Sequence, residues 1–327
     1  MTSGSVPRYL ITADPPRRLD PRFDLGVYLG EELLRRGARV DVLDLEEVDP
    51  PEAMSGLLER LPVRRVLAVD RSRRPPWELG PREPVPAEAY GVILHRKDPP
   101  VDRRYRAWHE PFASLPRHVL QVNRPPAIYG LSEHTVHLRF PRWAVPTRVC
   151  TSLPELVDAV RGTRPEAVLK PLHTYCGMGV SFVAPSAGEE ELAAYWERWG
   201  PGVTVQPYLD AVTSEGDIRV LVMGRRILGA VRRLPPAGSR LANLHAGGVA
   251  APAEVTPDQE AACREVAAAL NPEGLLLLGL DFIGGHLTEI NFTSPTLLVQ
   301  IEELSGRPAR AALADELETL WRDRRNG

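Results

Sequence analysis

Apolar residues in the first third of the chain fall into short continuous runs around one stretch with helical spacing. Residues 23–36 carry apolar side chains at three- and four-residue intervals, which predicts an amphipathic helix. Strands are predicted at four runs: 8–13, 37–43, 63–69 and 91–95. The proline-rich connector at 73–86 cannot be a regular helix, because interior prolines remove backbone donors. This alternation predicts an open α/β layer.

The remainder of the chain divides into two further units. A turn-rich linker at 123–130 precedes a second α/β unit, with predicted helices at 152–160 and 187–199. The third unit is predicted to contain strands at 203–206, 217–222 and 226–231 and a helix at 257–270. We therefore predict three parts: 1–125, 126–200 and 201–327.

A hairpin with oxygen-bearing side chains follows the last predicted helix. The apolar run 275–280 leads to Asp281, and Gly284-Gly285 makes a tight turn. The chain then returns with a two-residue period, so Glu289 and Asn291 face the same side. Carboxylate and amide oxygens suit Mg²⁺, which is usually held by one or two carboxylates together with substrate phosphates. The hairpin therefore predicts a nucleotide site.

Hydroxyl groups gather immediately after this hairpin. Ser294 and Thr296 flank Pro295, which stops the strand, so donors lie beside the proposed metal site. This cluster predicts a place where substrate binds.

Lys170 stands out because only two of the 40 basic residues are lysines, the other being Lys97. It lies in a predicted buried strand at 167–172, which is followed by a loop of small residues that enters another strand. Gly177 and Gly179 would let backbone amides approach phosphate oxygens, and Lys170 would add a compact positive charge. The pattern indicates phosphate binding, although it matches neither a Walker loop nor a Rossmann fingerprint.

The bulk composition is that of a water-soluble enzyme. A net charge of −3 over 327 residues argues against an extended nucleic-acid surface, and no apolar run reaches membrane-spanning length. The first residues lack the pattern of a secretory signal, so we expect a cytoplasmic protein. The three cysteines, Cys150, Cys176 and Cys263, lack metal-ligand spacing, and we expect reduced thiols. Cys176 lies in the phosphate loop, where a redox role is an open alternative.

Several motifs in order resemble the bacterial-type glutathione synthetases, which are ATP-grasp ligases. The resemblance spans nearly the whole chain and rests on these segments: Arg96-Lys97-Asp98-Pro99-Pro100, Leu169-Lys170-Pro171-Leu172, Gln206-Pro207-Tyr208-Leu209, Gly216-Asp217-Ile218-Arg219, Arg233-Leu234-Pro235, Asn243-Leu244-His245-Ala246-Gly247-Gly248, Gly279-Leu280-Asp281-Phe282, and Leu287-Thr288-Glu289-Ile290-Asn291-Phe292-Thr293-Ser294-Pro295-Thr296. It implies an α/β (α+β) ATP-grasp fold preceded by an N-terminal Rossmann-like domain.

The resemblance also implies a function and roles for residues. The reaction would join a carboxylate to an amine through an acyl phosphate, with γ-glutamylcysteine and glycine as substrates, ATP as co-substrate and Mg²⁺, or Mn²⁺, as metal. Asp281, Glu289 and Asn291 would hold the metal, and Arg219 and Arg233 would steady the transferring phosphoryl group. The ATP-binding residues would be Lys170, Gly177, Met178, Gly179, Ser181, Gln206, Tyr208, Leu209 and Asp217. Substrate would contact Asp20, Arg22, Lys97, Asn243, Ser294 and Thr296. A homo-oligomer is also implied.

Three departures from the family pattern keep other functions open. The phosphate loop is longer before its glycines, and an ATP-contacting lysine of the family is replaced in the segment Leu131-Ser132-Glu133-His134-Thr135-Val136-His137-Leu138. His134 or His137 would substitute for that lysine only when protonated, and a solvated surface role is the alternative. Arg240 is shifted by one position in the mobile loop. The alternatives are an ATP-grasp ligase with a different acyl donor and amine acceptor, and a non-catalytic ATP-binding regulator.

Overall fold

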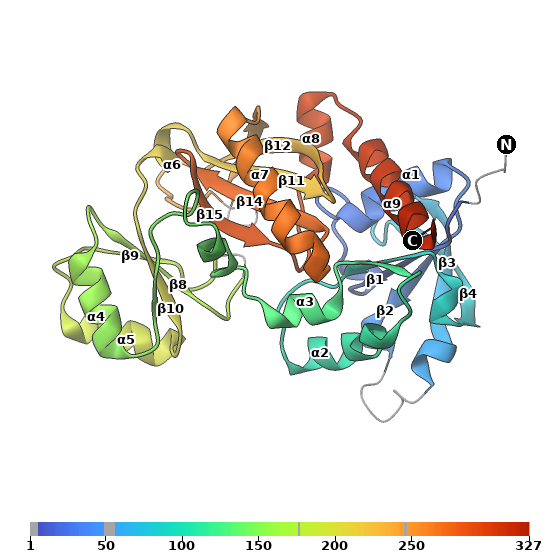
Figure 1. The fold of residues 1–327 in the computed structure, drawn as a ribbon, viewed down its shortest axis with the longest axis horizontal. Coiled ribbons are helices and arrows are strands. Elements are labelled where there is room, and N and C mark those ends of the chain that lie inside the picture. The colour runs from blue at the N-terminus through green and yellow to red at the C-terminus, as the bar shows by residue number, and fades with distance from the viewer. Residues whose placement is uncertain (1–5, 49–55, 176, 243, 245–246, 327) are drawn as a thin grey trace.

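The computed structural model describes residues 6–48, 56–175, 177–242, 244 and 247–326, and it contains three sheets. The first sheet has the strand order β4-β3-β2-β1-β5-β6, with β1, β2, β5 and β6 parallel. Its strands are β1 (Tyr9–Ala13), β2 (Val40–Asp44), β3 (Leu61–Val69), β4 (Trp77–Val85), β5 (Val92–Arg96) and β6 (Leu120–Val122). The accompanying helices are α1 (Leu25–Arg35), α2 (Arg103–His109) and α3 (Pro125–Gly130). The predicted open α/β layer is confirmed (Figure 1).

The second sheet has the order β7-β10-β8-β9 and is antiparallel. Its strands are β7 (Arg148–Cys150), β8 (Ala167–Pro171), β9 (Ser181–Val183) and β10 (Val203–Pro207), with helices α4 (Leu153–Gly162) and α5 (Glu189–Trp199). The Ser152 side chain caps α4, as predicted, by accepting from the Glu155 amide. Because β10 pairs with β7 and β8, the assignment of this strand to the third unit is wrong. The rest of the three-part division stays a prediction.

The third sheet, of order β13-β12-β11-β14-β15, carries the predicted hairpin. Its strands are β11 (Asp217–Met223), β12 (Arg226–Leu234), β13 (Val249–Pro252), β14 (Leu277–Ile283) and β15 (His286–Asn291), and the helices around it are α6 (Ala211–Ser214), α7 (Pro257–Leu270), α8 (Leu298–Ser305) and α9 (Ala309–Asn326). Gly284 and Gly285 have φ of 54° and 85°, the left-handed conformation that a two-residue hairpin turn requires. The β14–β15 hairpin is therefore confirmed.

Two segments predicted as connectors are regular elements. Residues 73–86 contain β4, which is an edge strand, and an edge tolerates Pro81 and Pro84 because one side of its backbone needs no partner. Residues 123–130 contain the short helix α3, which begins with two prolines at positions that need no backbone donor. Asn123, just before it, donates to the carbonyls of Leu277 and Phe292, at 2.7 Å each, and so ties this segment to both hairpin strands.

The last helix returns to the first sheet. α9 packs beside α1, where the Arg36 guanidinium bonds the Asp315 carboxylate at 2.8 Å, and Figure 1 shows the two helices side by side. One buried core cluster joins Tyr9, Leu29 and Leu33 to Leu313 and Leu317. The first and last segments of the chain therefore share a core.

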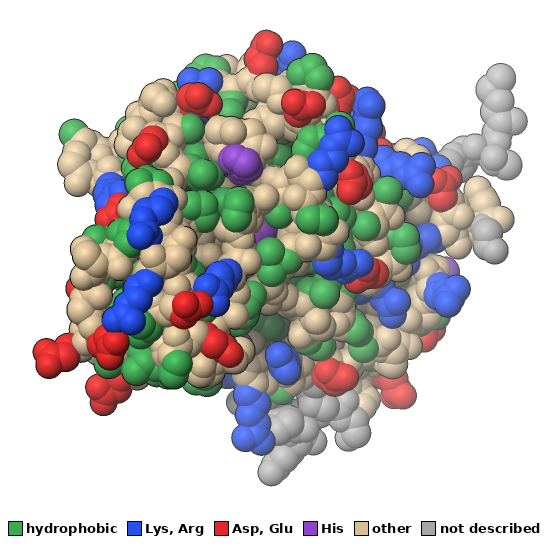
Figure 2. Space-filling view, turned by 60° about the vertical axis from the view of Figure 1, so that its left-hand side comes forward, with side chains coloured by type: hydrophobic (Ala, Val, Ile, Leu, Met, Phe, Trp, Pro, Cys, Tyr) green, Lys and Arg blue, Asp and Glu red, His purple; other side chains and the backbone are tan. Residues whose placement is uncertain are grey.

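The surface mixes charges, and none of the described helices is long and apolar enough to cross a membrane. The face in Figure 2 intersperses basic and acidic side chains. This is the surface that a small net charge predicts.

Candidate active site

The three sheets meet at one large cavity of about 910 Å³. Its walls include Asp98 from the loop after β5, Lys170 from β8, and Asp281 and Glu289 from the β14–β15 hairpin. A volume of this size accommodates a nucleotide-sized ligand together with a second small molecule. The polar walls indicate charged ligands.

A buried ion-pair cluster lies on the floor of this cavity. Arg219 on β11 donates two hydrogen bonds of 2.6 Å to the Asp281 carboxylate, its direct partner on β14. Arg233 on β12 approaches Asp217 at 2.6 Å and Asp281 at 2.8 Å. Burial alone would raise the pKa of Asp281, but the charges of Arg219 and Arg233 outweigh it, so the pKa is lowered and Asp281 stays ionised. The four side chains thus form one charged unit.

The predicted metal donors lie along the hairpin. Asp281 and Glu289 are direct cross-strand partners, and Asn291 lies two residues farther on the same face, where its amide donates to Asp281 Oδ2 at 3.2 Å. Two carboxylates facing each other repel unless positive charge compensates them. Asp281 has its arginines, whereas Glu289 has no lysine or arginine partner in the described part of the chain. Glu289 and the amide oxygen of Asn291 therefore fit Mg²⁺.

Lys170 is the unpaired positive charge of the opposite wall. Its side chain is half-buried, and no hydrogen bond or ion pair involves its ammonium within the described ranges. Lys97, by contrast, pairs with Asp14 and does not line the cavity, whereas Asp14 does. An uncompensated ammonium that faces a cavity indicates an anionic ligand.

The phosphate loop places only part of its predicted set in the cavity. Gly177 lines it, whereas Met178 is 43% exposed and Ser181 belongs to β9. Gly179 packs outside the lining, and a Cβ there would lie 2.7 Å from Pro171 Cγ and 2.9 Å from Trp199 Cδ2, so its role is the fold of the loop. Cys176 in this loop, and the predicted substrate residue Asn243, lie outside the described residues.

Aromatic side chains line the end of the cavity near β10. Tyr208 and Leu209, both predicted to bind ATP, line it, and Phe182 packs edge-on against the Tyr208 ring with centroids 5.7 Å apart. The Arg240 guanidinium lies 4.2 Å from the Phe182 centroid and 4.1 Å from the Tyr208 centroid, and it also pairs with Glu166. Flat aromatic and guanidinium surfaces suit a planar base.

Gln206 contacts protein rather than an open space. Its side-chain amide donates to Thr147 Oγ1 at 3.1 Å and to the Thr288 carbonyl at 3.4 Å. The buried His137 ring lies beside it, and burial lowers the pKa of His137 to about 4, with a smaller effect of the Lys170 charge. The Gln206 side chain therefore joins β10 to the hairpin, and Gln206 also lines the cavity.

The N-terminal wall contains further predicted substrate residues. Asp20 and Arg22 both line the cavity and bond each other at 2.7 Å, and Arg74 joins Asp20 from the loop before β4. Ser294 and Thr296 also line the cavity. The cavity therefore brings together most of the predicted site residues, which are Asp20, Arg22, Lys170, Gly177, Gln206, Tyr208, Leu209, Asp217, Arg219, Arg233, Asp281, Glu289, Asn291, Ser294 and Thr296.

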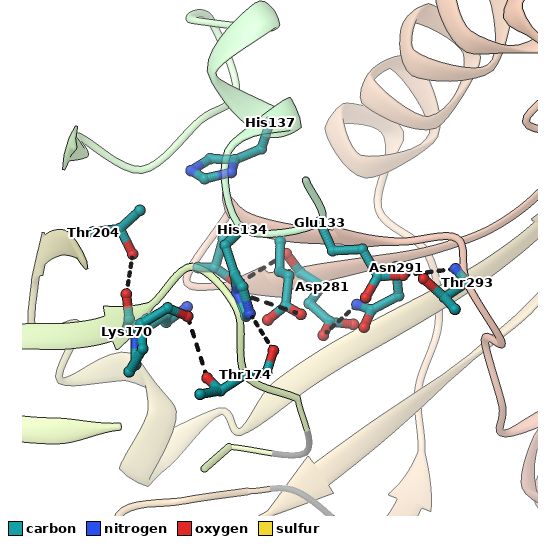
Figure 3. A network of polar contacts seen from close by, with 12 residues as sticks. Glu133, His134, His137, Lys170, Thr174, Thr204, Asp281, Asn291 and Thr293 are labelled. Atoms are coloured by element: carbon teal, nitrogen blue, oxygen red, sulfur yellow. Dashed lines mark hydrogen bonds and ion pairs between the residues drawn. The ribbon is translucent and has the colours of Figure 1, made fainter. Parts of the chain in front are cut away.

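Glu133 is a site residue for which no role was predicted. Its buried carboxylate accepts from the amides of Phe292, at 2.6 Å, and Thr293, at 2.7 Å. The neighbouring His134 lines the cavity, and Figure 3 shows its ring between Thr174 and the hairpin residues Asp281 and Asn291. No local pattern signals these contacts, because they join residues about 160 positions apart.

Comparisons with known proteins agree with this architecture. The model of the prokaryotic glutathione synthetase N-terminal domain matches residues 8–128, and that of the prokaryotic glutathione synthetase ATP-grasp domain matches residues 133–306. A glutathione synthetase of Parasynechococcus marenigrum (strain WH8102) is 34% identical over 96% of this chain and 99% of its own length. One from Thermosynechococcus vestitus is 32% identical over 90% of this chain and 94% of its own length.

Solved structures share the fold at lower identity. The D-cycloserine synthetase DcsG superposes with a TM-score of 0.67 at 18% identity, over 96% of this chain and 99% of its own. The ATP-grasp ligase PsnB, complexed with minimal precursor, Mg and ADP, gives a TM-score of 0.56 at 16% identity, over 96% and 98% of the two chains. These likenesses confirm the predicted ATP-grasp architecture, and with the two family models they show that the chain belongs to the prokaryotic glutathione synthetase family.

Proposed function

We propose that this protein joins γ-glutamylcysteine to glycine in an ATP-dependent reaction through an acyl phosphate. Family membership supports an ATP-grasp carbon–nitrogen ligase that acts on small molecules. One observation carries the proposal: two opposite charges that no lysine, arginine or acidic side chain of the described chain neutralises face the cavity from different walls. Lys170 presents a free ammonium on one wall and Glu289 a carboxylate without arginine or lysine on the other, in the described part of the chain. A metal–polyphosphate ligand satisfies both.

The residues of the charged cluster would act on the transferring phosphoryl group. A carboxylate is a poor electrophile, and its phosphorylation creates a leaving group that the amine then displaces. Mg²⁺ at Glu289, Asn291 and Asp281 would offset the negative charge of the ATP phosphates. Arg219 and Arg233 are already fixed by Asp281 and Asp217, so their remaining donors need no rearrangement to meet developing charge.

The nucleotide would lie between β8, β9 and β10. We propose that Lys170 and the Gly177 backbone contact phosphates, and that the base lies against Phe182, Tyr208 and Leu209. Arg240 stacks on both rings and would close this end of the cavity. Gln206 would pack behind the base site. Asp217 would accept a hydrogen bond from the ribose through the carboxylate oxygen that Arg233 does not occupy.

The dipeptide would lie against the N-terminal wall. Asp20, Arg22 and Arg74 present both signs of charge there, which suits the zwitterionic α-carbon of a γ-glutamyl group. Ser294 and Thr296 lie at the junction with the hairpin and would contact the reacting carboxylate. Lys97 acts indirectly in this proposal, since it positions Asp14.

The same resemblance leads us to propose a cytoplasmic homo-oligomer in which Mn²⁺ can replace Mg²⁺. Light scattering of the purified protein measures the subunit number, and a monomeric mass contradicts the proposed assembly.

The test of function is ADP release with Mg·ATP, γ-glutamylcysteine and glycine, each omitted in turn, with the product mass measured in the same sample. We expect ADP release to require both substrates and to yield the tripeptide. Glu289→Gln is the matched inactive control. ADP release that needs a different acyl donor or amine would move the assignment to another ligase, and ATP binding without any turnover would indicate a regulator.

A further inference from the structure

We propose that His134 is a nitrogen ligand of the divalent cation at Glu289 and Asn291, so that this site binds nitrogen-preferring transition ions better than an all-oxygen site does. The inference rests on the proposed function, because it concerns the metal–nucleotide site of that reaction. It concerns a residue outside the oxygen-donor set predicted on the hairpin.

His134 is held in place from two sides. On one side, the preceding residue is anchored to the hairpin exit: the Glu133 carboxylate accepts from the Phe292 and Thr293 amides at 2.6 and 2.7 Å. On the other side, His134 Nε2 lies 3.0 Å from the Thr174 carbonyl in the phosphate loop. Figure 3 shows this bridge between the loop and the hairpin. The imidazole is thus fixed before any ligand binds.

The hydrogen bond to Thr174 decides which ring nitrogen is free. A carbonyl oxygen only accepts, so Nε2 carries the hydrogen, and Nδ1 of the neutral ring presents a lone pair. Nδ1 is buried and has no hydrogen-bond partner among the described residues. It lies 4.0 Å from Glu289 Oε1. A lone pair and a carboxylate that face each other in a buried place need positive charge between them.

The separation of these two atoms fits one bound metal ion. Donors about 2.1 Å from a common cation can lie at most about 4.2 Å apart, and 4.0 Å falls inside that limit. A metal-bound imidazole whose other nitrogen donates to a backbone carbonyl is the usual arrangement in metalloproteins. No group of three or more His, Cys, Asp and Glu in the described chain is arranged to hold a metal alone. His134 and Glu289 therefore need the Asn291 amide and the phosphates to complete the shell.

A nitrogen donor changes the expected metal preference. Mg²⁺ takes oxygen ligands and water, whereas imidazole favours transition ions such as Co²⁺ and Zn²⁺ and adds affinity for Mn²⁺ as well. We expect loss of His134 to weaken Mn²⁺ and Co²⁺ binding about tenfold or more, in the range found when metal-site partners are removed. Mg²⁺ affinity should change less than about threefold, because Mg²⁺ gains little from nitrogen.

The experiment uses the full-length protein with Mn²⁺ and the non-hydrolysable analogue β,γ-methylene-ATP, which carries no nitrogen between its metal-binding phosphates. Pulsed electron paramagnetic resonance detects ¹⁴N coupling from an imidazole bound to Mn²⁺, and calorimetry measures the affinities for Mn²⁺, Co²⁺ and Mg²⁺. The variants are His134→Gln, His134→Lys and the control His173→Gln, whose exposed imidazole lies in the phosphate loop that His134 contacts. We expect ¹⁴N coupling in the wild type and His173→Gln, and its loss in both His134 variants.

Each other outcome overturns the proposal. Nucleotide-dependent Mn²⁺ binding without ¹⁴N coupling in the wild type removes His134 from the metal shell and leaves the proposed function standing. The same holds if His134→Lys keeps the Mn²⁺ affinity, since an ammonium replaces a phosphate contact but not a ligand lone pair. Absence of nucleotide-dependent Mn²⁺ binding in the wild type overturns the metal site itself and with it the proposed function. The wild-type spectrum decides even if a variant fails to fold.

Discussion

The two lysines of this chain differ in whether an acidic side chain neutralises their charge. We therefore expect different effects when each lysine is replaced. Lys97 is paired with Asp14, whereas Lys170 faces the cavity without a partner in the described ranges. We expect Lys170→Met to weaken ATP binding by about 1.5–3 kcal/mol, or roughly ten- to a hundredfold, because a charge-assisted contact is lost. Calorimetry with β,γ-imido-ATP measures this change.

Lys97→Met serves as the comparison for that measurement. It should leave the ATP dissociation constant nearly unchanged and raise the KM for γ-glutamylcysteine, since Asp14 loses its partner on the substrate wall. Equal losses of ATP affinity in both variants would contradict the assignment of Lys170 to the phosphates.

Asp281 and Glu289 are neighbouring carboxylates, but only Asp281 is paired with arginine side chains in the described chain. Asp281→Asn leaves Arg219 and Arg233 buried without a full counter-charge, and we expect the free energy of unfolding to fall by about 3–5 kcal/mol. Glu289→Gln removes a carboxylate that no lysine or arginine of the described chain contacts, so its unfolding free energy should change by less than about 1 kcal/mol.

Urea unfolding without nucleotide separates these two effects, and a Mg²⁺ titration with β,γ-imido-ATP then tests binding. Both variants should lose Mg²⁺ affinity if the metal site is correct. Strong destabilisation by Glu289→Gln in the absence of metal would show that Glu289 has a structural partner instead.

Single elements differ in how far the local sequence determines them. The hairpin was predictable because Gly284-Gly285 and the two-residue period each specify it independently. β4 was not, because prolines argue against a strand until its edge position is known. The grouping of β10 was missed for a related reason: sheet order is set by long-range pairing and not by neighbours in sequence.

The candidate site shows the same division. Motif residues such as Asp281 and Lys170 were found by residue type and spacing, and the structure places both in the cavity. Glu133 was not found, since its value depends on two backbone amides of a distant strand end. Gln206 was predicted to bind ATP, and its side-chain amide is occupied by protein partners that only the fold supplies.

At the level of elements, Trp321 is one of the contacts through which α9 holds the first sheet. It is buried, and a Cβ at Gly91 would lie 2.6 Å from its Nε1, so the two segments are in close contact. We expect Trp321→Ala to lower the free energy of unfolding by about 3–5 kcal/mol, as large-to-small core changes do. Hydrogen exchange should speed up in α9 and in β5.

Leu304→Ala on α8 is the control for that variant, since its side chain is 37% exposed and should cost less than about 1 kcal/mol. Faster exchange confined to α9, with β5 unchanged, would show that the helix is not part of the first core.

For the whole molecule, buried histidines predict a loss of stability in mild acid. Burial lowers the pKa of His95 to about 3 and that of His109 to about 4. In the unfolded chain both have a pKa near 6.5, so between about pH 6.5 and 4 the unfolded state binds more protons and stability falls as pH falls. The loss should reach roughly 2 kcal/mol for each histidine at pH 5.

His109→Phe tests this prediction, because the ring stacks on Tyr105 at 4.2 Å and Nε2 has no partner among the described groups. Urea unfolding at pH 7.5 and 5.0 should show a smaller pH effect in His109→Phe by about 2 kcal/mol. The exposed His118→Gln should keep the wild-type difference. An unchanged pH effect in His109→Phe would contradict the prediction.

The shared core of α1 and α9 also bears on synthesis at the ribosome. Leu29 and Leu33 leave the ribosome long before Leu313 and Leu317, which share their core, because most of the described chain lies between the two pairs. The first sheet therefore keeps an uncovered apolar flank until α9 is synthesised, and long-range contacts of this kind form slowly. We expect nascent chains that lack α9 to be held by chaperones, so that the synthesis of α9, rather than of the first sheet, allows the native core to form.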